Sequence, residues 1–192
     1  MFRKMRRFNL LGIGGSGMLP LAILMRQAGF DIQGSDQSLC EEKRETLSTN
    51  RIRVVSNNVD ANLTDIDCLV ISPAIPSHHP IVRRAKRLQL PVIHRSQALA
   101  TLLEGRQTIC IAGSHGKSTT VGMLIHILSE AGLPFGYMIG ASTSAMPSAR
   151  WNTDGSPFIL EACEAHGSLH DWQPSQVVLT NIDNEHVAHY GG

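Results

Sequence analysis

The chain has 192 residues, of which 42% are hydrophobic and 17% charged, the balance of a globular protein rather than a disordered one. Its formal net charge of +1 gives no general electrostatic reason to expect binding to nucleic acid or to a membrane surface. No apolar run approaches the ~18 residues of a membrane-spanning helix, so we expect no membrane insertion. The length allows one ordinary domain, or one small domain and part of another.

Residues 1–25 combine a basic start with an apolar stretch, which is the pattern of a secretory signal peptide. Glycines and a proline interrupt the apolar stretch, however, and no small-residue cleavage site follows it. We therefore interpret residues 8–13 as a buried strand. The basic residues before it are interpreted as a solvated start to that strand, because no aromatic platform for nucleic acid lies beside them.

Short apolar runs alternate with helical patterns along the first half of the chain. This alternation is typical of βαβ units that form a parallel sheet with right-handed connections, so the predicted fold class is α/β. The expected strands are residues 8–13, 30–36, 52–55, 67–72 and 91–94, and the expected helices are residues 19–28, 40–50, 79–89 and 96–105.

A second α/β unit is expected after a boundary at residues 104–107. It begins with a strand over residues 108–113 and a helix from Lys117 to Ala131, which Gly132 ends. A loop rich in small and turn-forming residues follows at 140–156. Two further buried strands are expected at residues 158–164 and 177–182.

The four cysteines are spread along the chain without a C-x-x-C pair. This usage is typical of reduced thiols in a cytosolic protein, and we expect a cytoplasmic location. The residues are Cys40, Cys68, Cys110 and Cys163.

A G-x-G-x-x-G pattern follows the first expected strand and opens the first expected helix, at Gly12, Gly14 and Gly17. In a dinucleotide-binding loop these glycines allow a tight turn, close approach of backbone N–H groups to phosphate, and close packing of helix on strand. Asp36 ends the second expected strand, near the offset of an acid that binds ribose. The alternative is a tight structural turn with an exposed Asp36.

Residues 113–120, with the sequence GSHGKSTT, have the context of a phosphate-binding loop between a strand and a helix. The strict Walker pattern requires a glycine where this chain has Ile111, but Gly116, Lys117 and Ser118 are intact. The backbone and Lys117 are expected to bind phosphate, and the hydroxyls of Ser118 and Thr119 to bind Mg²⁺. The alternative is a glycine-rich turn without a ligand.

Glu161 and Glu164 stand at the exit of an expected buried strand, where P-loop proteins place a carboxylate that holds Mg²⁺. Two histidine pairs invite a zinc hypothesis, but no cysteine lies at a matching spacing, so surface or capping roles are favoured for most of these residues. The pairs are His166 with His170, and His186 with His189.

Seven motifs together resemble the Mur ligase family in their order and spacing over essentially the whole chain. That family uses the loop pattern G-[ST]-H-G-K-[ST]-T, in which a residue such as Ile111 is normal. The motifs are LLGIGGSGM, QGSD, VISPAIP, PVIHRSQAL, AGSHGKSTT, EACE and LTNIDNEH.

The resemblance implies a Rossmann-like domain for a UDP-sugar over residues 1–104 and an incomplete P-loop ATPase domain over residues 105–192. Members also have a third domain that binds the incoming amino acid, and the chain stops at Gly192 within the second. We therefore expect a fragment or a truncated protein.

The resemblance also assigns site residues by their match to the family's motifs. Lys117, Glu161 and His186 take the catalytic positions, with Ser118, Glu161 and His186 as the Mg²⁺ ligands. The ATP-binding positions are Gly113, Ser114, His115, Gly116, Lys117, Ser118 and Thr119. The UDP-sugar positions are Gly12, Gly14, Gly15, Ser16, Gly17, Asp36 and Ser72.

The implied reaction joins L-alanine to UDP-N-acetylmuramate at the expense of ATP, through an acyl phosphate, in peptidoglycan precursor synthesis. The motif order is most similar to this member, and a related member that attaches a ready-made peptide is the nearest alternative. A non-catalytic nucleotide-binding module is a second alternative. A nicotinamide-dependent oxidoreductase would explain only the first glycine motif, and Gly116-Lys117-Ser118 argues against it.

Two local departures from the family pattern concern the surroundings of the metal ligands. Cys163 and His166 stand where many members have aspartate, although the form E-A-C-E is also found in the family, and Glu185 replaces a frequent aspartate before His186. The ligands themselves are intact, so the departures affect what surrounds them.

Overall fold

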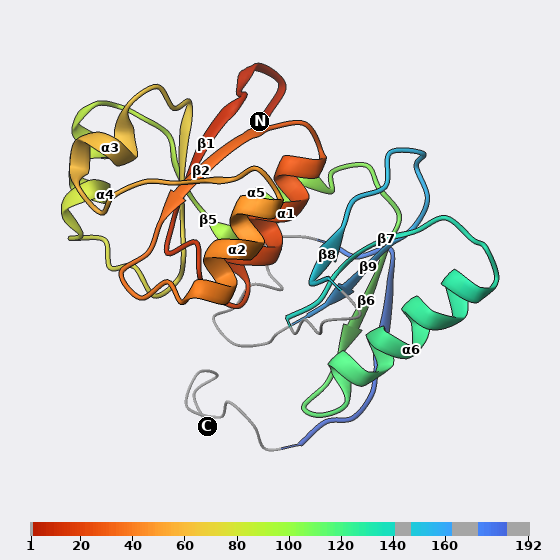
Figure 1. Cartoon of the computed structure of the whole chain (residues 1–192). Coiled ribbons are helices and arrows are strands. Elements are labelled where there is room, and N and C mark those ends of the chain that lie inside the picture. Colours follow the sequence, from red (N-terminus) through yellow and green to blue (C-terminus); the bar gives the residue numbers. More distant parts are fainter. Residues whose placement is uncertain (1, 141–146, 163–172, 184–192) are drawn as a thin grey trace. The chain divides into compact units, whose positions relative to one another are not determined.

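The computed structural model describes residues 2–140, 147–162 and 173–183 (Figure 1). The chain forms two compact units, Met1–Leu102 and Leu103–Gly192, and each is a strand-and-helix assembly around its own sheet. The predicted α/β class is therefore confirmed. None of the helices in the described residues has both the length and the apolar character that crossing a bilayer requires.

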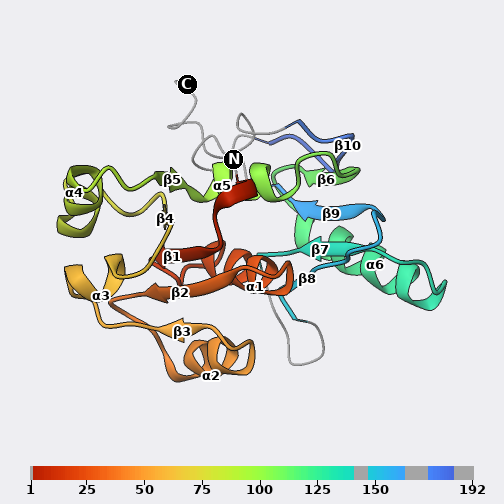
Figure 2. The same ribbon diagram turned by 90° about the horizontal axis from the view of Figure 1, so that it is seen from above.

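The first unit is built on a five-stranded sheet in which every neighbouring pair is parallel (Figure 2). The strand order is β3-β2-β1-β4-β5, with β1 at the centre. The strands are β1 (Arg7–Leu11), β2 (Asp31–Ser35), β3 (Arg53–Val54), β4 (Cys68–Ile71) and β5 (Val92–His94). The helices are the short 3₁₀ helix η1 (Phe2–Lys4), α1 (Met18–Gln27), α2 (Glu41–Thr49), α3 (Val59–Leu63), α4 (Pro80–Arg87) and α5 (Arg95–Leu102).

Helices cover both faces of this sheet, as a parallel sheet requires (Figure 1). On one face α3 and α4 contact each other and close over an apolar cluster that includes Leu11, Leu69, Ile71 and Ile81. Helix α1 contacts α2 and α5 on the other face. Every strand of the sheet is therefore held in place by packing, which fixes where its carboxyl end lies.

Helix α3 was not predicted, because it is short and polar. A buried hydrogen-bond network ties it to the sheet. The Asn62 carbonyl oxygen accepts from Asn9 Nδ2 at 3.0 Å and from Ser35 Oγ at 2.6 Å, and all three side chains are fully buried. The Asn62 amide donates to the backbone oxygens of Ser56 and Asn58. Such a network specifies one arrangement of helix and strands, since breaking it leaves buried polar groups unpaired.

The second unit contains a five-stranded sheet in the order β10-β6-β9-β7-β8. Three neighbouring pairs are parallel, and the short strand β8 is antiparallel to β7. The long helix α6 packs on one face over a cluster centred on Ile111, Val121 and Ile159. The elements are β6 (Thr108–Ala112), α6 (Lys117–Glu130), β7 (Gly136–Met138), β8 (Ala149–Arg150), β9 (Phe158–Glu161) and β10 (Gln176–Leu179).

Two expectations for the second unit were wrong. Residues 140–156 are not all loop, since β8 lies within them, and the strand β7 that pairs with β8 was not predicted. The strand at 177–182 was expected to be buried, but β10 is exposed along its whole length and ends at Leu179. It is an edge strand of the sheet, and Val177, Leu179 and Ile182 are 57%, 54% and 82% exposed. Their apolar character alone could not indicate that no described element covers them.

We expect Gly34→Ala to destabilise the first unit by about 1–3 kcal/mol, because it overpacks a closed site. A Cβ atom at position 34 would lie 2.5 Å from both Ile13 Cδ1 and the Leu10 carbonyl oxygen. Gly122→Ala in α6 is the control, since a Cβ there meets nothing within 4 Å. It should stabilise the second unit by about 0.5–1 kcal/mol, as alanine does in a helix interior.

Amide hydrogen exchange measures the free energy of opening in each unit separately. Unchanged protection of β1 and β2 in the Gly34→Ala variant would contradict the packing described.

Candidate functional site

The carboxyl ends of the three central strands of the first unit lie at the same edge of the sheet. Leu11 of β1 pairs with Ser35 of β2 on one side and with Ile71 of β4 on the other. The loops that follow these strands must therefore meet. In open parallel sheets this edge is where ligands bind.

The glycine loop, residues 12–17, is shaped by contacts from both neighbouring strands. Gly12 has φ +82°, a conformation that favours glycine. The N–H groups of Gly12 and Ile13 donate to the Ser35 carbonyl oxygen at 2.8 and 3.2 Å. A Cβ at Gly12 would lie 3.1 Å from Ser72 Cβ, so the residue after β4 sits against the loop. The structure thus brings the predicted substrate residues Gly12 and Ser72 together.

Asp36 also reaches the glycine loop. Its Oδ2 accepts from the Gly14 N–H at 2.8 Å, and its Oδ1 accepts from the Ser38 N–H at 2.9 Å. A Cβ at Gly14 would lie 3.0 Å from Asp36 Oδ2 and 2.8 Å from Leu39 Cδ1. Glycine at position 14 therefore leaves room for Asp36. The Gly14 N–H already has the Asp36 carboxylate as its acceptor, and the sequence pattern does not reveal this hydrogen bond.

The phosphate loop of the second unit, residues 113–117, connects β6 to α6. Gly116 caps the helix in the left-handed region at φ +80°. The Lys117 ammonium lies inside the loop and donates to the carbonyl oxygens of Gly113 and Ser114. The loop therefore curls around its own cation at the positive end of α6, a place that favours an anion.

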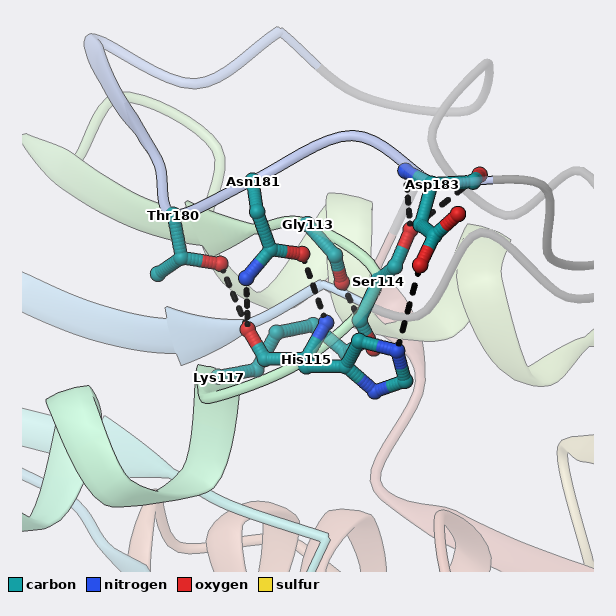
Figure 3. A network of polar contacts seen from close by, with 7 residues as sticks. All are labelled: Gly113, Ser114, His115, Lys117, Thr180, Asn181 and Asp183. Atoms are coloured by element: carbon teal, nitrogen blue, oxygen red, sulfur yellow. Dashed lines mark hydrogen bonds and ion pairs between the residues drawn. The ribbon is translucent and has the colours of Figure 1, made fainter.

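Residues 180–183, which follow β10, clamp this loop (Figure 3). Asn181 makes paired contacts with one residue, since its Oδ1 accepts from the His115 N–H at 2.9 Å and its Nδ2 donates to the His115 oxygen at 3.0 Å. Thr180 Oγ1 donates to the same oxygen at 2.7 Å. The Asp183 N–H donates to Ser114 Oγ at 2.9 Å. These hydrogen bonds from residues 180–183 restrain the loop at Ser114 and at His115.

This clamp gives a physical reason for the glycine at the start of the loop. A Cβ at Gly113 would collide with Thr180 Oγ1 and would lie 2.9 Å from the Asn181 carbonyl oxygen. Gly113 also has φ +130°. Ile111 lies within β6 and is fully buried in the core under α6, so a glycine is not needed there for the loop to turn.

His115 and Asp183 are also close, with His115 Nε2 and Asp183 Oδ2 3.8 Å apart. Both side chains are more than 60% exposed, so this pair contributes little to stability even when the histidine is protonated. The backbone contacts of Asn181 and Thr180 are the stronger restraint.

Glu161 lies beside the phosphate loop because its strand pairs with β6, Ile111 being opposite Glu161. Its Oε1 accepts from Ser118 Oγ at 2.7 Å, and its Oε2 accepts from the Gly140 N–H at 2.9 Å. Two oxygen ligands in adjacent positions around Mg²⁺ are about 2.9 Å apart, given metal–oxygen distances of about 2.0–2.1 Å. The Ser118 and Glu161 oxygens therefore fit a magnesium ion that replaces their hydrogen bond.

Among the described residues, no group of three or more His, Cys, Asp and Glu side chains gathers to hold a metal. The remaining predicted residues in this region lie outside the described residues. They are Cys163, Glu164, His166, His170, Glu185, His186 and His189.

The other predicted residues lie on the two loops. Gly15 closes a turn by donating to the Gly12 oxygen, and Ser16 is exposed. Thr119 is exposed in the first turn of α6. Sequence reasoning missed the loop contacts of Thr180 and Asn181. Both residues were placed inside the strand predicted over residues 177–182, but β10 ends at Leu179, so they follow it at the edge of the sheet where the loops of neighbouring strands lie.

Each loop follows a parallel strand and precedes a helix, the arrangement typical of nucleotide-binding α/β proteins. Residues 7–107 match the Mur ligase family, catalytic domain. The chain is 36% identical to a UDP-N-acetylmuramate–L-alanine ligase from Streptomyces avermitilis, over 97% of this chain and 40% of the relative. A ligase of the same name from Syntrophus aciditrophicus is 36% identical over 100% of this chain and 40% of its own length. The chain thus spans about 40% of the length of these curated relatives.

Solved structures of similar ligases support the same family. A UDP-N-acetylmuramate:L-alanyl-gamma-D-glutamyl-meso-diaminopimelate ligase from Neisseria meningitides has a TM-score of 0.86 and 29% identity, covering 95% of this chain and 62% of that one. A UDP-N-acetylmuramate-alanine ligase from Thermotoga maritima has a TM-score of 0.86 and 25% identity, covering 98% and 44%. The chain belongs to the Mur ligase family, as its motifs predicted.

We expect Asn181→Leu to loosen the phosphate loop. Losing the paired contacts leaves the His115 N–H without its acceptor, and one hydrogen bond contributes about 0.5–1.5 kcal/mol. Amide exchange at His115 should therefore quicken by roughly 2–13-fold, if the whole loss appears as local opening. Asn181→Asp is the matched control, because it keeps the Oδ1 acceptor and should leave this amide nearly as protected. Equal exchange in all three proteins would show that Asn181 does not restrain the loop.

Proposed function

We propose that this chain carries the nucleotide-sugar site and the ATP-phosphate site of an ATP-dependent ligase that joins L-alanine to UDP-N-acetylmuramate. The observation that carries the proposal is the presence of two loops in one chain, each at the carboxyl end of a parallel strand and each contacted by residues that follow the neighbouring strand. The relatives named UDP-N-acetylmuramate–L-alanine ligase support the choice of substrates. We place the reaction in peptidoglycan precursor synthesis in the cytoplasm.

In the first unit we assign the UDP diphosphate to the glycine loop and the N-terminus of α1. The contacts of Gly12 with Ser72 and of Gly14 with Asp36 support this assignment, because they hold the loop in one shape before any ligand arrives. Asp36 then lies where a carboxylate can accept hydrogen bonds from the nucleoside. The residues assigned are Gly12, Gly14, Gly15, Ser16, Gly17, Asp36 and Ser72.

In the second unit we assign the ATP phosphates to residues 113–119 and Mg²⁺ to Ser118 and Glu161, with His186 as a further ligand from the family pattern. When bound, Mg²⁺ supplies positive charge to the phosphate oxygens. Lys117 now donates to two loop carbonyls, and a phosphate entering the loop offers it a stronger, charged acceptor. Lys117 thereby stabilises charge on the phosphoryl group that transfers.

The proposed reaction needs no nucleophilic side chain. The muramate carboxylate attacks the γ-phosphorus of ATP, ADP leaves, and an acyl phosphate forms. The amine of L-alanine then attacks the acyl carbon, phosphate leaves, and an amide remains. The protein's part is to position the reactants and to stabilise charge.

A second candidate acceptor is a ready-made peptide. The Neisseria structure, whose title names a UDP-N-acetylmuramate:peptide ligase, matches this chain with the same TM-score as the alanine ligase structure and with 29% against 25% identity. The two candidates share the nucleotide-sugar and ATP sites and differ in the acceptor. An assay of phosphate release from ATP decides between them, with the longest polypeptide that the natural reading frame encodes as the enzyme. We expect release that requires both UDP-N-acetylmuramate and L-alanine, and release with the peptide but not with L-alanine would select the second candidate.

A third candidate is a nucleotide-binding module without catalysis. Ligase turnover by the 192-residue chain alone would exclude it.

We expect Gly14→Val to abolish detectable binding of UDP-N-acetylmuramate. The new side chain would collide with Leu39 and Asp36 and would displace the loop that we assign to the diphosphate. Isothermal titration calorimetry of both proteins measures the effect, with circular dichroism to show that the variant is folded. Undiminished affinity in a folded Gly14→Val variant would refute the site assignment.

We expect this chain to bind Mg-ATP weakly. We expect its affinity for inorganic triphosphate to be within about threefold of its affinity for Mg-ATP, because the described loop offers contacts for phosphate and none for the base. Lys117→Ala should lower both affinities by at least tenfold, since a charged hydrogen bond contributes about 1.5–3 kcal/mol. Titration calorimetry with the two ligands makes the comparison. Tight ATP binding far above that of triphosphate would show that the chain also contains a pocket for the base.

A further inference from the structure

The glycine loop has few backbone donors left for an anion. Among the described residues of this loop, Ser16 and Gly17 are the two whose backbone N–H groups do not donate to another part of the protein. The others are engaged as follows: Gly12 and Ile13 donate to the Ser35 oxygen, Gly14 to Asp36, Gly15 to the Gly12 oxygen, and Met18 and Leu19 to the Gly15 oxygen.

A diphosphate at this loop would therefore meet an unfavourable balance of charge. A bound nucleoside diphosphate sugar carries two negative charges, whereas the N-terminus of a helix supplies only about half a positive charge. The Asp36 carboxylate, held on the Gly14 N–H, adds a further negative charge beside the loop. Two N–H groups and one helix end do not offset this, so a cationic side chain is needed.

Lys43 is in the right place. It lies in the first turns of α2, is half-buried, and donates from Nζ to the Gly14 carbonyl oxygen at 2.6 Å. The Gly14 residue is thus held by an acid at its N–H and by an ammonium at its carbonyl. An ammonium has three N–H donors, and the carbonyl takes one of them.

A second cation, Arg95, lies at the other end of the loop. A Cβ at Gly17 would collide with the Arg95 guanidinium, so this group fills the space beside the Gly17 backbone. The loop is therefore flanked by a lysine near Gly14 and by an arginine near Gly17.

We propose that Lys43 is a substrate-binding residue whose ammonium pairs with the diphosphate of the nucleotide-sugar and offsets the charge of Asp36. The inference rests on the proposed function of the first unit and adds to it a residue that none of the motifs contains. Helix α2 carries two cations, Lys43 and Arg44, and Arg44 is exposed. Replacing Arg44 is the matched control, because it removes the same charge from the same helix.

The test compares UDP with uridine, which lacks the phosphates, for four forms of the chain: unchanged, Lys43→Gln, Lys43→Arg and Arg44→Gln. Affinities are measured by calorimetry for UDP and by NMR titration for uridine. We expect Lys43→Gln to weaken UDP binding about 10–100-fold, the range of a charge-assisted hydrogen bond, and to leave uridine binding unchanged. Lys43→Arg should keep UDP affinity within about fivefold, and Arg44→Gln should match the unchanged chain.

Each other outcome is decisive. If Lys43→Gln weakens UDP and uridine equally, Lys43 only supports the loop and the inference is wrong. If it binds UDP as well as the unchanged chain does, the inference is also wrong, while the nucleotide-sugar site stands. If the unchanged chain binds neither UDP nor UDP-N-acetylmuramate, the proposed function of this unit fails, and the inference fails with it.

Discussion

In both units, the glycine-containing loop after an interior strand is held by a segment that follows the neighbouring strand. Ser35 and Asp36 hold the loop after β1, and Thr180 and Asn181 hold the loop after β6. This approach is possible because parallel strands end at the same edge of a sheet. It also requires glycine, since a Cβ at Gly14 or Gly113 would collide with the segment that approaches it. The shape of each candidate site therefore depends on sheet register as much as on the loop's own sequence.

The two sites differ in how they present charge. In the second unit the cation belongs to the loop itself, and Lys117 rests on the loop's own carbonyl oxygens. In the first unit the loop sequence contains no cation, and the charged groups that reach it, Asp36 and Lys43, come from β2's end and from α2. The lysine that we propose to bind phosphate can thus be found from a local motif in the second unit and only from the fold in the first.

Most of the secondary structure of the first unit could be predicted, because its buried strands are short apolar runs separated by helical patterns. Helix α3 could not, since what stabilises it is the buried contact of Asn62 with Asn9 and Ser35, and no local pattern contains that contact. Strand β10 was wrongly predicted to be buried, because its valines and leucine are typical of a core strand but lie at the edge of the sheet. The family was predictable from linked motifs, whereas the Asn181 clamp depends on which strand ends meet, and the contact of Lys43 with Gly14 depends on where α2 lies.

The central claim is that the chain has two separate anion sites, one for a nucleotide-sugar and one for the phosphates of ATP. NMR titration of the isotopically labelled chain with UDP-N-acetylmuramate, and separately with Mg-ATP, tests it most directly. The account predicts that the first ligand shifts the backbone signals of residues 12–17, Asp36 and Ser72, and that the second shifts those of residues 113–119 and Asn181. Shifts of one common set of residues by both ligands, or none near the glycine loop with UDP-N-acetylmuramate, would contradict it.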